Sequence, residues 1–266
     1  MRVNVHAGHA KDGNKFCGAD GGSIGVKESV ENRKIKDSII KYLRQSNNTV
    51  YDCTVDSGSD AKDILKKICN KCNSHTVDID LSIHLNAYNK SPADGKTKGV
   101  ECWCYSTSST KASAIAKRIC NNISKLGFTN RGVKYNTGYY VLKNTKAESI
   151  IVECLFCDDE DDAKQYKKVG ADAIGKAIAE AIINKTIQSS GTSSSSGTTS
   201  SGAFLVRVTV DELNVRAGAG VTYKINQVVK KGEVFTIIET FNNNGTVWGK
   251  LKSGAGWISL KYTERV

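Results

Sequence analysis

The sequence contains no run of 18 or more apolar residues, which is the length that a membrane-spanning helix needs. Its first residues, Met1-Arg2-Val3-Asn4-Val5-His6, also lack the long apolar core of a secretory signal peptide. We therefore expect no membrane span. We also expect synthesis in the cytoplasm, so that any action outside the membrane would need a separate release step.

The chain also lacks the cysteine pattern of a disulfide framework. Its nine cysteines are odd in number, and all of them precede residue 158. Together with the expected cytoplasmic synthesis, this predicts mostly free thiols. A structural zinc site at Cys69-x-x-Cys72 with Cys102-x-Cys104, or a redox pair at Cys154-x-x-Cys157, is an alternative with weaker support because the spacing is loose.

Features of nucleic-acid binders are missing as well. The formal charge of +11 indicates an anionic partner surface. However, the sequence has neither strips of aromatic and basic residues nor zinc-finger spacing, so we do not expect nucleic acid as the partner. An anionic polymer such as a bacterial cell wall fits the charge equally well.

Residues 188–202 contain only Gln, Ser, Gly and Thr, without a charge or an apolar side chain. Such a segment is typical of a flexible linker. It divides the chain into two predicted domains, residues 1–187 and 203–266.

The first domain alternates strand-like runs with helix-like segments. The apolar stripe from Val30 to Leu43 has helical spacing, and the segment is predicted as a helix over 30–42. This alternation predicts an α/β fold, a twisted and mostly parallel sheet flanked by helices. The predicted strands lie near 2–6, 49–55, 78–84, 98–105, 139–142 and 149–153, and the other predicted helices are 60–68, 112–126 and 171–183.

The second domain changes character to short strands separated by Gly-rich turns. About sixty residues of this type predict a small all-β barrel. The predicted strands are 205–210, 213–216, 225–229, 234–240, 246–251 and 256–258.

Three imidazole or acidic residues lie at or just after apolar strand-like runs. His9 follows the first run, His84 follows residues 79–83, and Glu153 continues residues 149–152. A fourth, Glu28, begins a helix-like segment. Ligands of open α/β sheets bind at the carboxyl ends of the strands, so we expect these side chains to converge. Two histidines and a carboxylate with an open fourth position are typical of catalytic zinc sites, which predicts a zinc hydrolase.

The first domain resembles the zinc-dependent N-acetylmuramoyl-L-alanine amidases of the amidase-3 family over about residues 1–186. The resemblance departs from the family pattern at Ala10 and at Cys154-Leu155, where the family usually has glycine. It is carried by the stretches Val3–Ala10, Gly25–Asn32, Leu81–Ala87, Asn130–Lys134, Tyr140–Lys143 and Ile151–Phe156.

That resemblance implies that His9, Glu28 and His84 hold Zn²⁺ and that Glu153 is the catalytic carboxylate. It also makes Asn86 and Arg131 candidates for substrate binding. The implied activity is cleavage of the amide bond between N-acetylmuramic acid and L-alanine in peptidoglycan. A zinc peptidase that cuts the stem peptide, or a wall-binding protein without activity, remains an alternative.

The second domain resembles bacterial SH3-type domains over nearly all of 205–264. Such modules bind cell-wall peptide or glycan, so Tyr223 and Trp248 are candidate wall contacts, whereas Trp257 is expected in the core. A phage endolysin released at lysis fits both domains best, and a bacterial autolysin is the alternative. The matching stretches are Glu212–Gly220, Val229–Glu233, Trp248–Leu251 and Gly256–Ser259.

Overall fold

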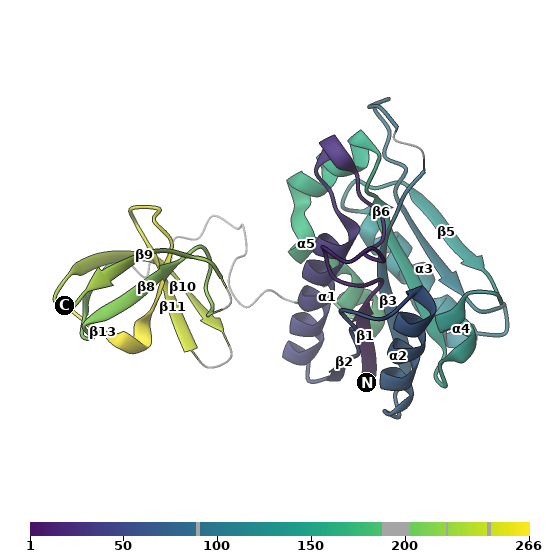
Figure 1. Cartoon of the computed structure of the whole chain (residues 1–266), viewed down its shortest axis with the longest axis horizontal. Helices are drawn as coiled ribbons and strands as arrows, with labels where there is room; N and C mark the ends of the chain where they lie inside the picture. The colour runs from purple at the N-terminus through teal and green to yellow at the C-terminus, as the bar shows by residue number, and fades with distance from the viewer. Residues whose placement is uncertain (89–90, 188–202, 222, 244–245) are drawn as a thin grey trace. The chain divides into compact units, whose positions relative to one another are not determined.

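The computed structural model describes residues 1–88, 91–187, 203–221, 223–243 and 246–266 (Figure 1). The chain forms two compact units, Met1–Ser190 and Gly191–Val266. Their boundary falls within the predicted linker 188–202, which lies outside the described residues. In the described ranges, every helix is too short or too polar to cross a membrane.

The first unit is built on a six-stranded sheet with the order β2-β1-β3-β6-β4-β5. All neighbouring pairs are parallel except β4 and β6, which are antiparallel. The predicted α/β class with a mostly parallel sheet is therefore confirmed. The strands are β1 (Arg2–Ala7), β2 (Thr49–Asp52), β3 (Ile79–Asn86), β4 (Val100–Cys104), β5 (Asn130–Tyr135) and β6 (Ser149–Phe156).

Helices cover both faces of this sheet. The main apolar core joins one face to α1, α3 and α5, and a smaller core joins the other face to α2 and α4. Figure 1 shows α1 and α2 on opposite sides of the strands. The helices are α1 (Glu28–Gln45), α2 (Ala61–Asn73), α3 (Thr110–Ser124), α4 (Tyr140–Asn144) and α5 (Glu160–Ile183), with a short 3-10 turn η1 at Gly22–Ile24.

The two faces of the sheet differ sharply in polarity. On β3, Ile79, Leu81, Ile83 and Leu85 all lie in the main core. The alternate residues of β3 point to the opposite face because side chains alternate along a strand. Those residues are Asp80, Ser82, His84 and Asn86, so this second face carries polar groups.

Three elements of the first unit differ from the sequence prediction. The run 139–142 was predicted as a strand but belongs to helix α4, and short apolar runs do not distinguish the two states. The sixth strand is instead β5, a charged edge strand with no buried residue that gives no apolar signal. Helix α5 begins at Glu160, well before the predicted 171. Gly170, with φ +78°, interrupts the helix, and the sequence pattern predicts only the part that follows this residue.

The second unit is all-β, as predicted, and its strand pairs are antiparallel. Its sheet order is β13-β7-β10-β11-β12-β8-β9, around a core that includes Val206, Val215, Ile237 and Ile258. Only β13 and the turn η2 (Leu260–Tyr262) were not predicted. The strands are β7 (Phe204–Val208), β8 (Glu212–Arg216), β9 (Ile225–Lys230), β10 (Val234–Asn243), β11 (Thr246–Leu251), β12 (Trp257–Ser259) and β13 (Thr263–Arg265).

All nine cysteines are free thiols, which confirms the prediction from their number. Eight are buried, and only Cys17 is partly exposed. Within the described ranges, no group of three or more metal-binding side chains includes a cysteine. The alternative of a cysteine zinc site is therefore not supported.

Candidate active site

The three predicted metal ligands converge at the carboxyl end of the sheet. His9 follows β1, His84 lies on β3 and Glu28 is the first residue of α1. Their ligand atoms all lie within 4.8 Å of one another. The strand-end rule therefore brings together residues that are up to 75 positions apart in the chain.

A single carboxylate oxygen stands between the two imidazoles. Glu28 Oε1 lies 2.9 Å from His84 Nδ1 and 3.4 Å from His9 Nε2. The two rings meet edge to face with centroids 4.9 Å apart. Ligands of a tetrahedral zinc at its usual bond lengths are separated by roughly 3.3 Å, so ligand atoms that all lie within 4.8 Å of one another are close enough to hold such an ion.

The backbone around these ligands depends on close approach and on an unusual turn. A Cβ atom on Gly8 would lie 2.0 Å from the His84 ring, so only glycine fits at that position. His9 itself has φ +62°, in the left-handed region that few residues other than glycine adopt. The position of the His9 side chain therefore depends on the close approach of Gly8 to His84 and on the positive φ of His9.

Glu28 is held in its ionised form. Burial alone would raise its pKa, but the hydrogen bond and charge of His84 outweigh burial and lower the pKa below its usual range. Backbone N–H groups of Ala19 and Leu85 also donate to its two oxygens, at 2.8 and 3.2 Å. Since the carboxylate sits at the start of α1, the helix dipole favours its charge as well.

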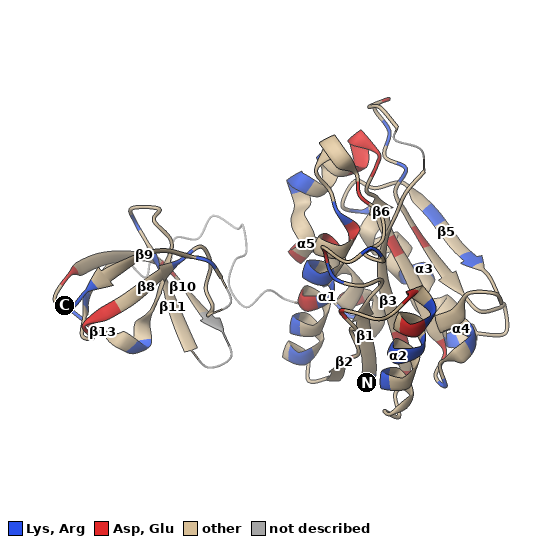
Figure 2. Cartoon of the chain, viewed as in Figure 1, with Lys and Arg blue, Asp and Glu red and all other residues tan. Residues whose placement is uncertain are grey.

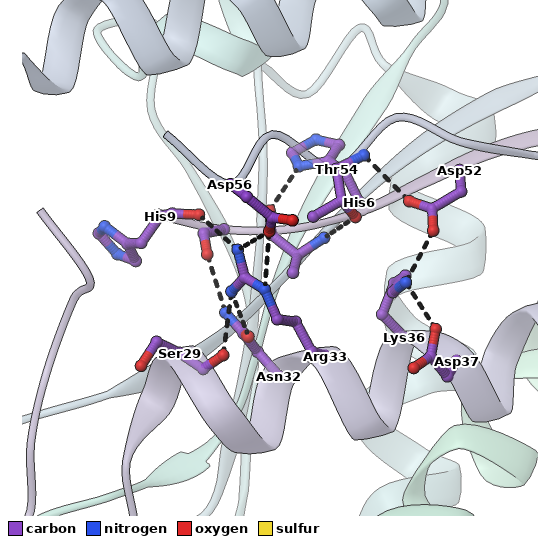
Figure 3. A network of polar contacts seen from close by, with 12 residues as sticks. His6, His9, Ser29, Asn32, Arg33, Lys36, Asp37, Asp52, Thr54 and Asp56 are labelled. Carbon is purple, nitrogen blue, oxygen red and sulfur yellow. Dashed lines mark hydrogen bonds and ion pairs between the residues drawn. The ribbon is translucent and has the colours of Figure 1, made fainter. Parts of the chain in front are cut away.

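Helix α1 also supports the His9 turn from below (Figure 3). Asn32 donates from Nδ2 to the Gly8 carbonyl at 2.9 Å, and Arg33 donates from Nη2 to the His9 carbonyl at 3.3 Å. Asp56 accepts from the same Arg33 Nη2 at 2.9 Å, which fixes the guanidinium. Asn32 and Arg33, adjacent residues of α1, thus donate to the carbonyls of His9, the residue with positive φ, and of Gly8, the residue before it.

Glu153 lies beside this triad on the neighbouring strand. It pairs in register with His84 of β3. Its Oε2 is fully buried and has no hydrogen-bond partner. Burial raises its pKa to about 7, a value suited to a group that both accepts and donates a proton near neutral pH.

A cavity of about 290 Å³ opens next to these groups. His9, His84 and Glu153 contribute its polar side. The opposite wall is apolar and comes from the loop after β1, from α2 and from the α4 region, including Phe16, Ile64, Leu65, Tyr139, Tyr140 and Val141. A substrate group of moderate size can therefore lie against the reacting centre.

Of the predicted substrate-binding residues, Asn86 lies on β3 two residues after His84, whereas Arg131 lies on β5, three strands away in the sheet. Both donate to Glu101, Asn86 from Nδ2 at 3.2 Å and Arg131 from Nε at 2.6 Å. Sequence reasoning missed Glu101, which is buried on β4. Its position as a lone acid in a strand of apolar residues and cysteines was the available signal.

The predicted wall contacts in the second unit differ in exposure. Tyr223 is 51% exposed, as a binding residue requires. Trp248 is only 4% exposed, which speaks against a direct ligand contact because its ring packs inside the unit. Trp257, expected in the core, is instead only partly buried, with Lys250 Nζ 5.7 Å from its ring centroid.

Comparisons with known proteins agree with this geometry. Residues 3–184 match the N-acetylmuramoyl-L-alanine amidase family, and residues 211–264 match the bacterial SH3 domain. The first unit is also similar to the catalytic domain of an endolysin that targets Clostridium difficile. That similarity has a TM-score of 0.61 and 26% identity, and it covers 71% of this chain and 99% of the other.

Two sequence relatives extend the comparison. An uncharacterized protein of Clostridium perfringens is 35% identical over 191 residues, which cover 71% of this chain but only about half (53%) of the relative. The endolysin of Bacillus phage SPP1 is 30% identical over 95% of this chain and 93% of its own length. The chain therefore belongs to the N-acetylmuramoyl-L-alanine amidase family and carries a bacterial SH3 domain after its amidase domain.

Proposed function

We propose that this chain is a zinc-dependent N-acetylmuramoyl-L-alanine amidase that degrades bacterial peptidoglycan. The observation that carries the proposal is the convergence of two imidazoles and an ionised carboxylate beside a second carboxylate with an unpaired oxygen. Family membership supports the same bond as the target. The substrate is the amide that joins the lactyl group of muramic acid to L-alanine.

His9, Glu28 and His84 would hold the metal, and two of them, His9 and His84, also line the cavity. Zinc supplies Lewis-acid chemistry, activating water and polarising a carbonyl near neutral pH. Glu153 takes a proton from the attacking water at its unpaired oxygen and returns it to the leaving amino group of L-alanine. The apolar wall of the cavity limits competing water around the scissile amide.

The SH3 domain would bind the cell wall and raise the concentration of the amidase domain on an insoluble polymer. The endolysin of Bacillus phage SPP1 has similar sequence over almost the whole chain, which favours a phage endolysin that reaches the wall after release from the host cytoplasm. A bacterial autolysin is the second candidate, supported by 28% identity over 168 residues to the amidase LytC of Bacillus subtilis.

Product analysis of purified walls tests the proposal. An amidase frees L-alanine amino termini without new reducing sugar ends, whereas a stem peptidase frees other amino termini. Chelation should abolish this activity, and added zinc should restore it. Full activity in a metal-free preparation, or amino termini other than L-alanine, would contradict the proposal.

A further inference from the structure

A pair of basic side chains on β5, the second strand after β6 in the sheet order, lies close to the reacting centre. Glu101 of β4 pairs in antiparallel register with Glu153 of β6. Residues directly opposite in such a pair share a face and have Cβ atoms about 5 Å apart. Arg131 and Lys134 of β5 reach Glu101 from the following strand, and β5 carries basic positions along its length (Figure 2).

Glu101 anchors this pair and has no further capacity to accept. Arg131 Nε and Lys134 Nζ each lie 2.6 Å from its Oε2. Its Oε1 accepts from Trp103 Nε1 at 3.1 Å and from Asn86 Nδ2 at 3.2 Å. Four donors on one carboxylate fill its acceptor sites. Because two cations face one anion, one unit of positive charge remains uncompensated in the cluster.

The two cations have donors to spare. Arg131 uses only Nε toward Glu101, and its two terminal amino groups contact no other acceptor among the described residues. The side chains of Arg131 and Lys134 are 36% and 34% exposed, whereas that of Glu101 is 3% exposed. The cations therefore reach solvent while a buried anion holds them in place.

Aromatic rings further restrict both cations. The guanidinium of Arg131 lies 4.9 Å from the Phe156 ring, and Lys134 Nζ lies 5.2 Å from the Trp103 ring. Side chains fixed in this way lose little conformational freedom when a ligand binds. A fixed fork of guanidinium donors beside an ammonium group is suited to a carboxylate.

We propose that Arg131 and Lys134 bind the first free carboxylate of the stem peptide, which lies on the acidic residue after L-alanine. In a muramoyl peptide the lactyl carboxyl is consumed by the scissile amide, so the remaining carboxylates lie on the peptide. The pair stands between one and two strand spacings from Glu153, about 5 to 10 Å. An extended peptide advances about 3.5 Å per residue, so the carboxylate of the second residue comes within reach.

This inference rests on the proposed amidase function and adds the direction in which the substrate lies on the sheet. The peptide would run over β4 and β5, and the sugar would lie over the opposite side of the triad. The enzyme would also distinguish stems by charge, because a carboxamide on the second residue cannot form the ion pair.

Three soluble muramoyl peptides test the proposal. One has free carboxylates, one is amidated on the second residue, and one is amidated only on the third. We expect the zinc-loaded wild-type chain to cleave the first and third with similar kcat/KM and the second roughly tenfold or more slowly, as loss of a charged hydrogen bond predicts.

Lys134→Gln should reduce kcat/KM for the free carboxylate and leave the substrate amidated on the second residue nearly unchanged. Lys134→Arg should retain the preference, since it keeps the charge. Lys117→Gln is the matched control, because Lys117 is an exposed lysine of helix α3, which packs on the main-core face of the sheet, opposite to the face that carries Glu101. Circular dichroism checks that the variants fold. The comparison of the three peptides with the wild-type chain tests the proposal even if a variant does not fold.

The outcomes are separable. Equal wild-type cleavage of all three peptides, or an equal loss on all three in Lys134→Gln, overturns the carboxylate subsite alone. A preference lost by amidation of the third residue overturns its assignment to the second. A wild-type chain that cleaves none of them overturns the proposed function and the subsite together.

Discussion

Glu28 and Glu153 are chemically identical residues that the structure places in different surroundings. Glu28 lies between two imidazoles and two backbone donors, which keep it ionised. Glu153 has one oxygen buried without a partner, and burial raises its pKa to about 7. The first is therefore suited to hold a cation and the second to move a proton.

Replacing Glu153 with Gln should separate these roles. The amide keeps the shape of the side chain but cannot accept the proton, so turnover should fall roughly 10²–10⁴-fold. Zinc content should stay near that of the wild type if Glu153 is the proposed base and not a ligand. Metal analysis and muropeptide turnover measure both quantities, and loss of zinc from this variant would mean that base and ligand are interchanged.

Glu28→Gln should show the opposite pattern. It removes a charged ligand, so zinc should be lost on dialysis, and activity should fall with it. Glu160→Gln, an exposed acid at the start of α5, is the control and should keep its metal. Retention of zinc by Glu28→Gln at wild-type affinity would contradict the assignment.

The pKa of Glu153 also has a consequence for stability in the metal-free protein. Its folded-state pKa of about 7 exceeds the unfolded value of about 4.3, so the native state holds the proton more tightly. Stability conferred by that proton is present below pH 4 and is lost as the pH rises toward 7. Above pH 7, metal-free Glu153→Gln should therefore be more stable than the wild type by about 1–3 kcal/mol.

Urea unfolding at pH 5 and pH 8 checks this prediction. The advantage of the variant should be larger at pH 8. An equal difference at the two pH values would show that the carboxylate does not titrate differently on folding.

At this scale the sequence predicted the four central residues but not their neighbours. His9, His84 and Glu153 follow from the rule that ligands gather at strand ends, Glu28 from its place at the head of a helix-like segment, and their roles from the family resemblance. Glu101 could not be found in the same way, because its place beside Glu153 depends on β4 running antiparallel, which no local pattern reveals.

Among the elements, helix α1 has a second role besides covering the sheet. Its residue Asn32 is fully buried and donates to the Gly8 carbonyl next to the left-handed turn. The helix thus contributes one proposed ligand, Glu28, at its first residue and supports another, His9, one turn later. Shifting this helix along its axis would disturb both.

Asn32→Ala should therefore weaken both folding and metal binding. Loss of a buried hydrogen bond costs about 1–3 kcal/mol of unfolding free energy. Loss of support for a ligand typically lowers metal affinity roughly 10–100-fold. Denaturant unfolding and zinc titration measure the two effects, with Lys34→Ala on the exposed side of the same helix as the control. Unchanged zinc affinity would show that the His9 turn keeps its conformation without the hydrogen bond from Asn32.

The elements themselves were largely predictable where burial is periodic. Strands β1, β3 and β6 and helices α1 and α3 follow from apolar runs or stripes whose positions pack in the core. The failures, at β5 and α4, have a physical reason. An edge strand exposed to solvent needs no apolar pattern, and a one-turn helix carries too few residues to show a period.

At the scale of the whole molecule, the thiols report on the compartment. All nine are free, and eight lie in cores where burial protects them from oxidants. Thiol titration of the unfolded, unreduced protein should therefore report close to nine. Cys17, the one partly exposed thiol, should react alone in the native state, and a count below three in the unfolded chain would contradict cytoplasmic synthesis.

The position of β6 in the sheet affects when the enzyme can become active. This strand is the last of its sheet along the chain, yet it lies between β3 and β4 and carries Glu153. During synthesis, β3 and β4 cannot be joined into one sheet until residues 149–156, which form β6 between them, have emerged from the ribosome. A nascent or prematurely terminated amidase domain therefore lacks a completed sheet and Glu153, its proposed proton-transfer group, so we expect amidase activity only once this domain is nearly complete.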